Sequence, residues 1–216
     1  SLLSSPEPSL GILLQYPGTA DPQQRTIPLP AAQAHSLTIP TEDPLLGVIG
    51  AGNYSSRILI PAFATAGARF HTLTASTGVG PVLVGRKFGF IQASTDVPAL
   101  LADPSCSAVV IATRHDSHAS LVCQALAARK HVFVEKPLCL TAEELHSIQA
   151  AYTGEQLLMI GFNRRFAPLV LDLQQQLQNL SGPKAFIYTC NAGSIPPEHW
   201  TQNPALGGGR LLGEAC

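Results

Sequence analysis

The sequence predicts an α/β fold in which a parallel β-sheet is covered by helices on both faces. From Pro44 onward, short and continuously apolar runs alternate with amphipathic stretches. Such runs are typical of buried parallel strands, and the stretches between them are typical of crossover helices. Charged residues make up only 12% of the 216 residues, about half of the usual share of ~25%, which excludes a chain dominated by disordered segments.

The alternation predicts a defined series of elements. Strands are expected at residues 45–49, 70–75, 107–112, 131–134 and 157–160, and helices at 54–66, 116–129 and 141–152. We expect Asp116 to cap the second helix, and Thr141 with Glu144 forms the capping box S/T-x-x-E at the start of the third. After Gly161 the pattern predicts a helix over 166–179 and a strand over 185–189.

Three regions follow from this pattern. Residues 1–43 hold seven of the 18 prolines and are interpreted as a Pro-rich linker, apart from an apolar run at 10–17 that we expect to be the last strand of a preceding domain. Residues 44–162 are expected to form the α/β domain. Residues 163–216 are too short to close a second core, so we expect them to be the truncated start of an α/β domain for substrate binding and oligomerisation.

Charge and cysteine content exclude several classes. The net charge of −1 gives no basic surface for nucleic acid, and no apolar run approaches the ~18 residues of a membrane span. The five cysteines lack paired spacing, which argues against a disulfide scaffold and against a metal site. No signal peptide is visible, so the expected location is the cytoplasm.

A glycine-rich turn follows the first strand. It reads Gly50-Ala51-Gly52-Asn53-Tyr54-Ser55, or G-x-G-x-x-S, and leads into a helix. Such a turn lets the backbone approach a pyrophosphate, although a G-x-G pair alone is also compatible with a plain turn. Because this glycine-rich turn follows the first strand of an alternating β/α series, it favours a Rossmann-type doubly wound sheet that binds a dinucleotide.

The second strand lacks the acidic residue of an NAD fingerprint. It ends at Ala75-Ser76-Thr77-Gly78, and Arg86 and Lys87 follow. A hydroxyl with nearby cations suits a 2′-phosphate, which favours NADP over NAD. The alternative interpretation is that Arg86 and Lys87 are solvated residues at a helix end.

Two further motifs stand at carboxyl ends of strands, where ligands bind in such sheets. The first is Ala112-Thr113-Arg114-His115-Asp116-Ser117-His118, and the second is Glu135-Lys136-Pro137. Taken alone, His118 is better explained as a hydrogen-bonded structural residue, and Lys136 as a surface lysine before a turn. A lysine at the rim of a nicotinamide pocket can instead bond a substrate hydroxyl and share its proton.

Together with Gly-Phe-Asn-Arg-Arg-Phe at 161–166 and the Gly-Gly-Gly-Arg-Leu-Leu-Gly-Glu-Ala-Cys tail, these motifs resemble the Gfo/Idh/MocA oxidoreductases. The resemblance covers residues 45–216 in order. It implies an NAD(P)-dependent enzyme that moves a hydride between nicotinamide and a sugar, a polyol or a related carbonyl. It also implies a C-terminal domain whose open sheet mediates homo-oligomer formation.

The resemblance assigns roles to particular residues. It implies that Lys136 is catalytic, that Gly50, Gly52, Asn53 and Tyr54 line the pyrophosphate, and that Thr113, His118 and Glu135 lie near the nicotinamide ribose. Ala51, Ser76, Arg114 and Lys136 itself complete the expected cofactor-binding set. Asn163 and Arg164 are expected to face the active-site cleft.

The sequence departs from the family pattern in two places. Arg114 stands where many members have proline, and Gly213 stands where the family has an aspartate. The family's catalytic histidine would come after Cys216, so we expect residues 1–216 alone to be inactive.

Two alternatives to an enzyme stay open. The first is a non-catalytic module that senses NAD(P) or serves as an interaction surface. The second is a methyltransferase that binds S-adenosylmethionine. The run at 10–17 resembles the last strand of a zinc-type medium-chain alcohol dehydrogenase, so we also expect a covalent fusion to such a domain.

Overall fold

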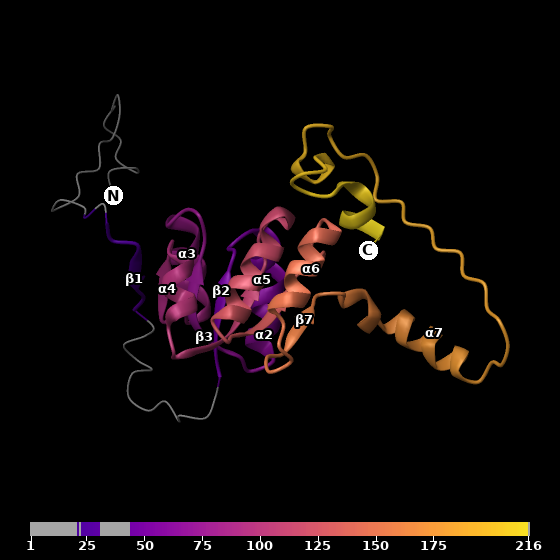
Figure 1. Cartoon of the computed structure of the whole chain (residues 1–216), viewed down its shortest axis with the longest axis horizontal. Helices are drawn as coiled ribbons and strands as arrows, with labels where there is room; N and C mark the ends of the chain where they lie inside the picture. Colours follow the sequence, from indigo (N-terminus) through magenta and orange to yellow (C-terminus); the bar gives the residue numbers. More distant parts are fainter. Residues whose placement is uncertain (1–20, 22, 31–43, 216) are drawn as a thin grey trace, which may run out of the picture.

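The chain folds around a seven-stranded β-sheet (Figure 1). The computed structural model describes residue 21, residues 23–30 and residues 44–215. The strands are β1 (Thr26–Pro28), β2 (Leu45–Ile49), β3 (Arg69–Thr74), β4 (Gln92–Ser94), β5 (Cys106–Ile111), β6 (His131–Val134) and β7 (Leu158–Ile160). Their order is β1-β4-β3-β2-β5-β6-β7, and every neighbouring pair is parallel except β1 and β4. The predicted α/β fold class with a Rossmann-type sheet is confirmed.

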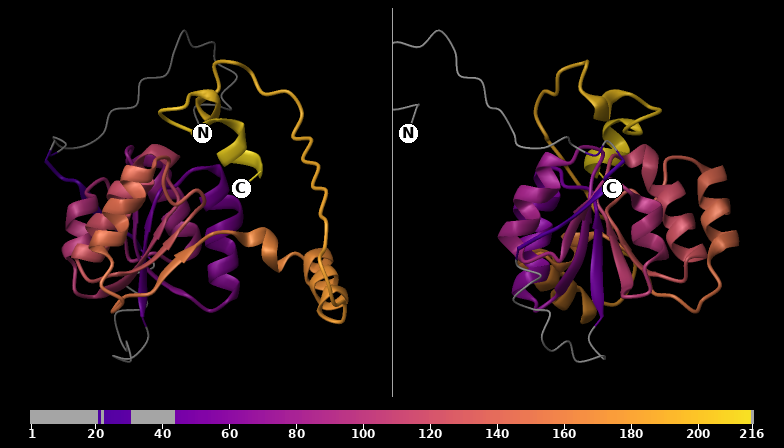
Figure 2. Two further views of the ribbon diagram at one scale, coloured as in Figure 1. Left: turned by 45° about the vertical axis from the view of Figure 1, so that its right-hand side comes forward. Right: turned by 90° about the vertical axis from the view of Figure 1, so that its left-hand side faces the viewer.

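Helices cover both faces of the sheet (Figure 2). The α-helices are α2 (Ile60–Thr65), α3 (Val79–Phe88), α4 (Val97–Ala102), α5 (His118–Ala127), α6 (Ala142–Ala151) and α7 (Pro168–Gln178). A π-helical stretch, Ser55–Leu59, runs directly into α2. In the part of the chain that the structure describes, no helix is both long enough and apolar enough to span a membrane.

The strands form two cores because their side chains alternate between the faces. On β5, Val109 and Ile111 pack with residues of α4, α5 and α6, whereas Val110 packs with residues of α2 and the strands beside it on the other face. Phe70 and Phe90 stack in this second core, with ring centroids 4.5 Å apart. Continuously apolar strands are therefore buried on both sides, as the sequence predicts.

The helix starts differ in how well they were predicted. The capping box of α6 is confirmed: Thr141 Oγ1 accepts from Glu144 N at 3.2 Å, and the Glu144 carboxylate accepts from Thr141 N at 3.3 Å. The predicted cap of α5 is wrong. Asp116 lies within a 3₁₀ turn, His115–Ser117, and α5 begins after Ser117 without a side-chain cap. The Asp116 backbone N–H instead donates to Leu206 O, a contact that local sequence does not reveal.

One strand lies inside the expected linker. Thr26–Pro28 pairs antiparallel with β4 at the edge of the sheet, where a proline costs no ladder hydrogen bond. Leu29, directly after it, is buried against Gly85 in the core with Phe70 and Phe90. This part of residues 1–43 therefore belongs to the sheet. The run at 10–17 and its predicted strand lie outside the described residues.

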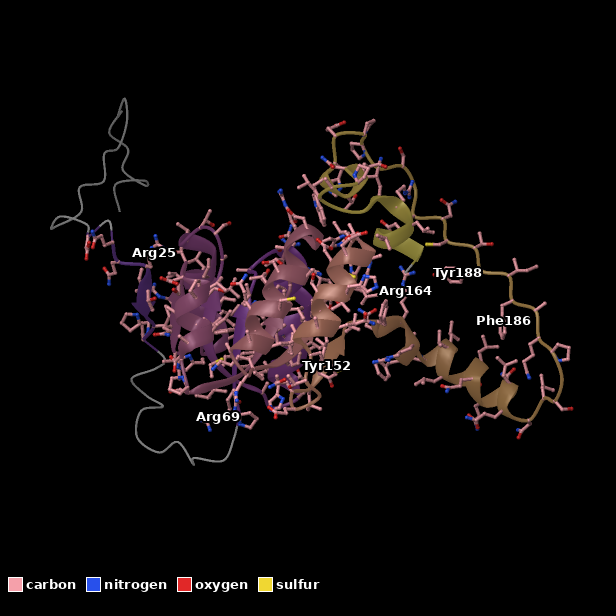
Figure 3. All side chains as sticks on the ribbon, in the orientation of Figure 1. Arg25, Arg69, Tyr152, Arg164, Phe186 and Tyr188 are labelled. Atoms are coloured by element: carbon pink, nitrogen blue, oxygen red, sulfur yellow. The ribbon has the colours of Figure 1, made fainter. Side chains whose placement is uncertain are left out.

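Beyond β7 the chain leaves the sheet and returns to it. Helix α7 confirms the predicted helix and projects away from the sheet (Figure 1). The C-terminal turn, a π-helical stretch Leu211–Ala215, lies near the carboxyl end of β6. The strand predicted at 185–189 is wrong: these residues are extended but make no ladder with any described strand. Phe186 and Tyr188 are exposed on this connection (Figure 3).

The capping box of α6 provides a test of the fold. Thr141→Ala removes the acceptor for the Glu144 N–H, so we expect the free energy of unfolding to fall by about 1 kcal/mol. Ser147→Ala, at an exposed position of the same helix, is the matched control and should change stability by less than about 0.5 kcal/mol. Urea unfolding followed by circular dichroism measures both, and equal effects of the two substitutions would contradict the assignment.

Candidate functional site

A pocket of about 1080 Å³ opens along the carboxyl ends of β2, β3, β4 and β5. Hydrogen bonds that continue past the strands hold these ends in line: Gly50 N donates to Thr74 O at 2.8 Å, and Ala112 N donates to Ile49 O at 2.8 Å. The strands are parallel, so the loops that follow them all meet at this one edge. The pocket is large enough for an extended ligand with several polar groups.

The glycine turn forms the floor of the pocket. Gly50 has φ +111°, and a Cβ there would lie 2.3 Å from Ala112 O, so only glycine fits. A Cβ on Gly52 would meet no atom within 4 Å, because this position faces open space in the pocket. Ala51, Asn53 and Tyr54 also line the pocket. The turn therefore leaves its backbone open to a ligand.

The end of β3 lines the same pocket through Ala75, Ser76 and Thr77. The cations that favoured NADP do not lie there. Arg86 and Lys87 are exposed in the last turn of α3, and Lys87 Nζ lies 5.1 Å from the centroid of the Phe88 ring. A ten-residue helix is about 15 Å long, so these side chains are at the far end from Ser76. They match the alternative interpretation of solvated helix-end residues.

The end of β5 supplies Thr113 and Arg114 to the pocket wall. His118 has a different position. It is fully buried, with Nδ1 2.7 Å from Pro137 O and Nε2 3.2 Å from Thr113 O. It therefore joins the loop after β5 to the loop after β6. With no exposed surface, it fits the structural interpretation better than direct contact with a cofactor.

The end of β6 carries a buried carboxylate. Glu135 lies beside Gly161, where a Cβ would be 2.9 Å from Glu135 Oε1, and this oxygen is buried without a hydrogen-bond partner. Burial raises the pKa of Glu135 above its usual value. Burial, and secondly the Glu135 charge, raise the pKa of Tyr54, whose hydroxyl accepts from Asn163 Nδ2 at 2.9 Å. Tyr54, Glu135 and Asn163 thus form one polar group beside the pocket.

Lys136 is next to Glu135 and contacts the C-terminal turn. Its Nζ donates to Gly213 O, so Lys136 meets the position at which the sequence departs from the family pattern. Arg164 also reaches this turn, donating to Glu214 O at 3.0 Å and to the Tyr188 hydroxyl at 2.8 Å (Figure 3). The structure therefore brings Lys136 and Arg164 to the same short segment.

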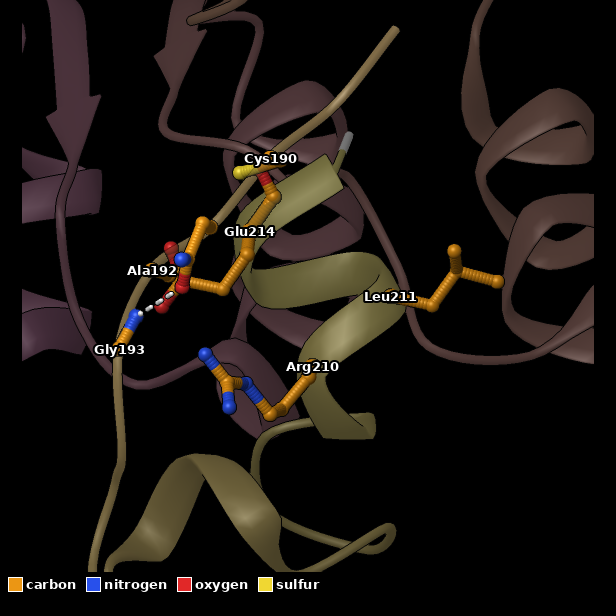
Figure 4. Close-up of a pocket in the computed structure, with 7 residues that line it drawn as sticks. Cys190, Ala192, Gly193, Arg210, Leu211 and Glu214 are labelled. Carbon is orange, nitrogen blue, oxygen red and sulfur yellow. Dashed lines mark hydrogen bonds between the residues drawn. The ribbon is translucent and has the colours of Figure 1, made fainter.

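A second pocket, of about 330 Å³, lies between this segment and the chain at 190–193 (Figure 4). It is lined by Cys190, Asn191, Ala192, Gly193, Arg210, Leu211 and Glu214. Figure 4 shows the Arg210 guanidinium extending toward the 192–193 backbone, while Leu211 points away. The pocket is on the side of the segment that also contacts Arg164.

Trp200 is a pocket residue that the sequence analysis did not single out. It begins a 3₁₀ turn, Trp200–Gln202, and lines the large pocket. Its ring makes an edge contact with His115, with centroids 4.8 Å apart. Trp200 is the only tryptophan in the sequence, and this rarity was the only feature that could have singled it out. Its position beside the strand ends is visible only in the folded chain.

The family model described as "Oxidoreductase family, NAD-binding Rossmann fold", the Gfo/Idh/MocA family, matches residues 45–162. The chain belongs to this family. The match spans β2 to β7 and includes the glycine turn and Lys136. The pocket at the strand ends is therefore at the place where this fold binds its nucleotide.

Relatives of known activity share part of the chain. It is 38% identical over 98 residues to inositol 2-dehydrogenase of Acidothermus cellulolyticus, covering 44% of this chain and 29% of that protein. It is 33% identical over 120 residues to scyllo-inositol 2-dehydrogenase (NAD(+)) of Bacillus subtilis, covering 53% and 35% respectively. The chain thus spans about a third of the length of these relatives.

Solved structures share the fold. A crystal structure of a 3-ketoreductase from Actinomadura kijaniata, in complex with NADP and TDP-benzene, superposes with a TM-score of 0.66 at 24% identity. The superposition covers 79% of this chain and 54% of that one. At this identity the similarity supports the architecture of the Gfo/Idh/MocA domain.

The residues present fit an NAD(P) molecule. The glycine turn is open at Gly52, and two buried polar atoms nearby, Ser55 Oγ and Glu135 Oε1, have no partner within the described chain. Buried polar atoms normally have partners, so such orphans are expected where a ligand supplies the missing hydrogen bond. Hydroxyls of Ser76 and Thr113 stand on either side of the turn.

The two glycines of the turn should respond differently to substitution. Gly50→Ala forces a side chain into Ala112 O at an unfavourable φ, so we expect a loss of at least about 2 kcal/mol in the free energy of unfolding. Gly52→Ala should keep wild-type stability but weaken nucleotide binding, because its methyl group occupies the pocket. Chemical unfolding and calorimetric titration with NADH separate the two effects. A stable Gly50→Ala protein would contradict this geometry.

The buried carboxylate predicts a pH dependence. Because burial raises the folded-state pKa of Glu135, the folded chain holds this proton more tightly than the unfolded chain. The contribution of Glu135 to stability is therefore complete below its unfolded pKa and declines as the pH rises through the folded value. Relative to wild type, Glu135→Gln should gain stability as the pH rises above the unfolded-state pKa of Glu, about 4.3. A stability difference independent of pH would show that Glu135 titrates normally.

Proposed function

We propose that this chain is the nucleotide-binding part of an NAD(P)-dependent oxidoreductase that acts on CH–OH groups of polyols or sugars. The observation that carries this proposal is the large pocket across the strand ends, opened by the Gly50–Gly52 turn, in a chain of the Gfo/Idh/MocA family. The inositol dehydrogenase activity of two relatives supports the substrate class. The bound nicotinamide supplies the hydride acceptor or donor.

Within the pocket, each strand end has a separate task. The turn at Gly50, Ala51, Gly52 and Asn53 offers its backbone to the pyrophosphate. Ser76 faces the adenosine ribose, and Thr113 faces the nicotinamide ribose. Glu135 lies beside the nicotinamide end of the pocket, and the Tyr54 hydroxyl helps to hold its carboxylate in place. Either NAD or NADP is accepted, because no acidic residue follows β3 and no cation from α3 reaches Ser76.

Lys136 is the proposed catalytic residue. An ammonium group has three donors, and the contact with Gly213 O uses one of them. The remaining donors would orient the oxygen of a substrate hydroxyl or carbonyl and stabilise negative charge on that oxygen during hydride transfer. Asn163 and Arg164 border the same place and are proposed to contact the substrate.

Lys136→Ala tests the catalytic assignment. In the whole enzyme that contains this chain, turnover of inositols or sugars should fall at least about tenfold, while the Kd for NADH stays within about twofold. Lys87→Ala, an exposed lysine on α3, is the control and should leave both quantities unchanged. Dehydrogenase assays with inositols and sugars and calorimetric titration measure these effects. Unchanged turnover in Lys136→Ala would contradict the role of Lys136. Nucleotide binding by a whole enzyme that oxidises none of these alcohols would favour the non-catalytic sensor.

A further inference from the structure

Arg114 is one of only two charged residues that line the large pocket within the described chain, and Asp116 is the other. NAD carries a negative charge on each phosphate of its pyrophosphate, and NADP carries a further phosphate. A pocket for such a ligand gains affinity from a cation, because charge-assisted hydrogen bonds to phosphate are stronger than those from neutral donors. Arg114 is the only pocket-lining cation that the described chain provides.

The guanidinium of Arg114 is held in place but has free donors. Its carbon atom Cζ lies 5.9 Å from the centroid of the Trp200 ring, in the range of a cation–π contact. Its backbone oxygen accepts from Ser117 N at 3.1 Å and from Ser117 Oγ at 2.8 Å, which fixes the loop. The guanidinium makes no hydrogen bond or ion pair with any described residue. Its planar set of donors suits two phosphate oxygens at once.

We propose that Arg114 binds the pyrophosphate of the nucleotide in this pocket, and that Trp200 is the platform that holds its guanidinium there. The inference rests on the proposed function. It goes further by identifying a phosphate-binding cation and by linking nucleotide affinity to a segment far along the chain.

The strand order decides which phosphate Arg114 reaches. β5 lies next to β2, whose end carries the glycine turn, whereas β3 with Ser76 lies on the other side of β2. Neighbouring strands are about 4.8 Å apart, so Arg114 is one strand from the pyrophosphate turn and two strands from the position of a 2′-phosphate. Arg114 therefore contributes equally to NADH and NADPH binding.

Trp200 acts through Arg114 and is a positioning residue. Its segment docks on the loop after β5 through Asp116 N, which donates to Leu206 O at 3.2 Å, and His115 Nδ1, which donates to Gly207 O at 2.9 Å. Docking of this segment places the Trp200 ring under the guanidinium. The orientation of Arg114, and with it nucleotide affinity, depends on that docking.

Calorimetric titration of the 216-residue chain with NADH and with NADPH tests the proposal. Arg114→Gln should weaken binding of both nucleotides by at least about tenfold, because a charge-assisted phosphate contact is lost. Arg86→Gln, an exposed cation outside the pocket, is the matched control and should stay within about twofold of wild type. Added salt should weaken binding by the wild type more than binding by Arg114→Gln, because the lost contact is ionic. Thermal unfolding without nucleotide should give the same midpoint for all three proteins.

The outcomes separate this inference from the proposed function. Wild-type affinity in Arg114→Gln overturns the role of Arg114 and leaves the proposed function intact. A loss of affinity for NADPH alone would indicate that the guanidinium contacts the 2′-phosphate, and it also overturns the assignment. A folded wild-type chain that binds neither nucleotide overturns the proposed function, and this inference with it.

Variants of Trp200 test the platform. Trp200→Ala should weaken the binding of both nucleotides. The double variant with Arg114→Gln should bind them no more weakly than Arg114→Gln alone. Trp200→Phe should restore most of the affinity, because a phenyl ring keeps the cation–π contact. Additive losses, or no rescue by phenylalanine, would overturn the coupling between Trp200 and Arg114.

Discussion

The close approach of the β2–α2 turn to the end of β5 is the constraint on which the site depends. At Gly50 the backbone passes so near Ala112 O that no side chain is accommodated. This contact brings the glycine turn beside Thr113 and Arg114, so one pocket spans four adjacent strands of the sheet. A wider turn would separate the open backbone at Gly52 from the loop that carries Thr113 and Arg114.

The part of the fold that local sequence dictates was predicted well. The continuously apolar strands and the Thr141 capping box depend on residues that are neighbours in sequence. Two of the failures involve distant partners. β1 forms because it pairs with β4 at the edge of the sheet. The 3₁₀ turn at Asp116 is held by the hydrogen bond from Asp116 N to Leu206 O. For the same reason the sequence could name His118 and Arg86 but could not place one in the core and the other at the far end of a helix.

The C-terminal segment is the link between the two halves of the candidate site. It lines the large pocket through Trp200, and the backbone oxygens of Gly213 and Glu214 accept from Lys136 and Arg164. The large pocket and Lys136 lie at ends of adjacent strands, and this segment contacts both. The family motifs alone would have left Trp200 and its contact with Arg114 unnoticed, because aromatic and cationic residues so far apart in sequence meet only after folding.

The most direct measurement is an NMR titration of the ¹⁵N-labelled chain with NADPH, followed through backbone amide shifts. The account predicts that the largest shifts fall on the amides of Gly50, Gly52 and Asn53, with further shifts at Ser76 and Thr113, at the ends of β3 and β5. Shifts confined to α7 and the 185–189 connection, or saturation without any change at the glycine turn, would contradict it.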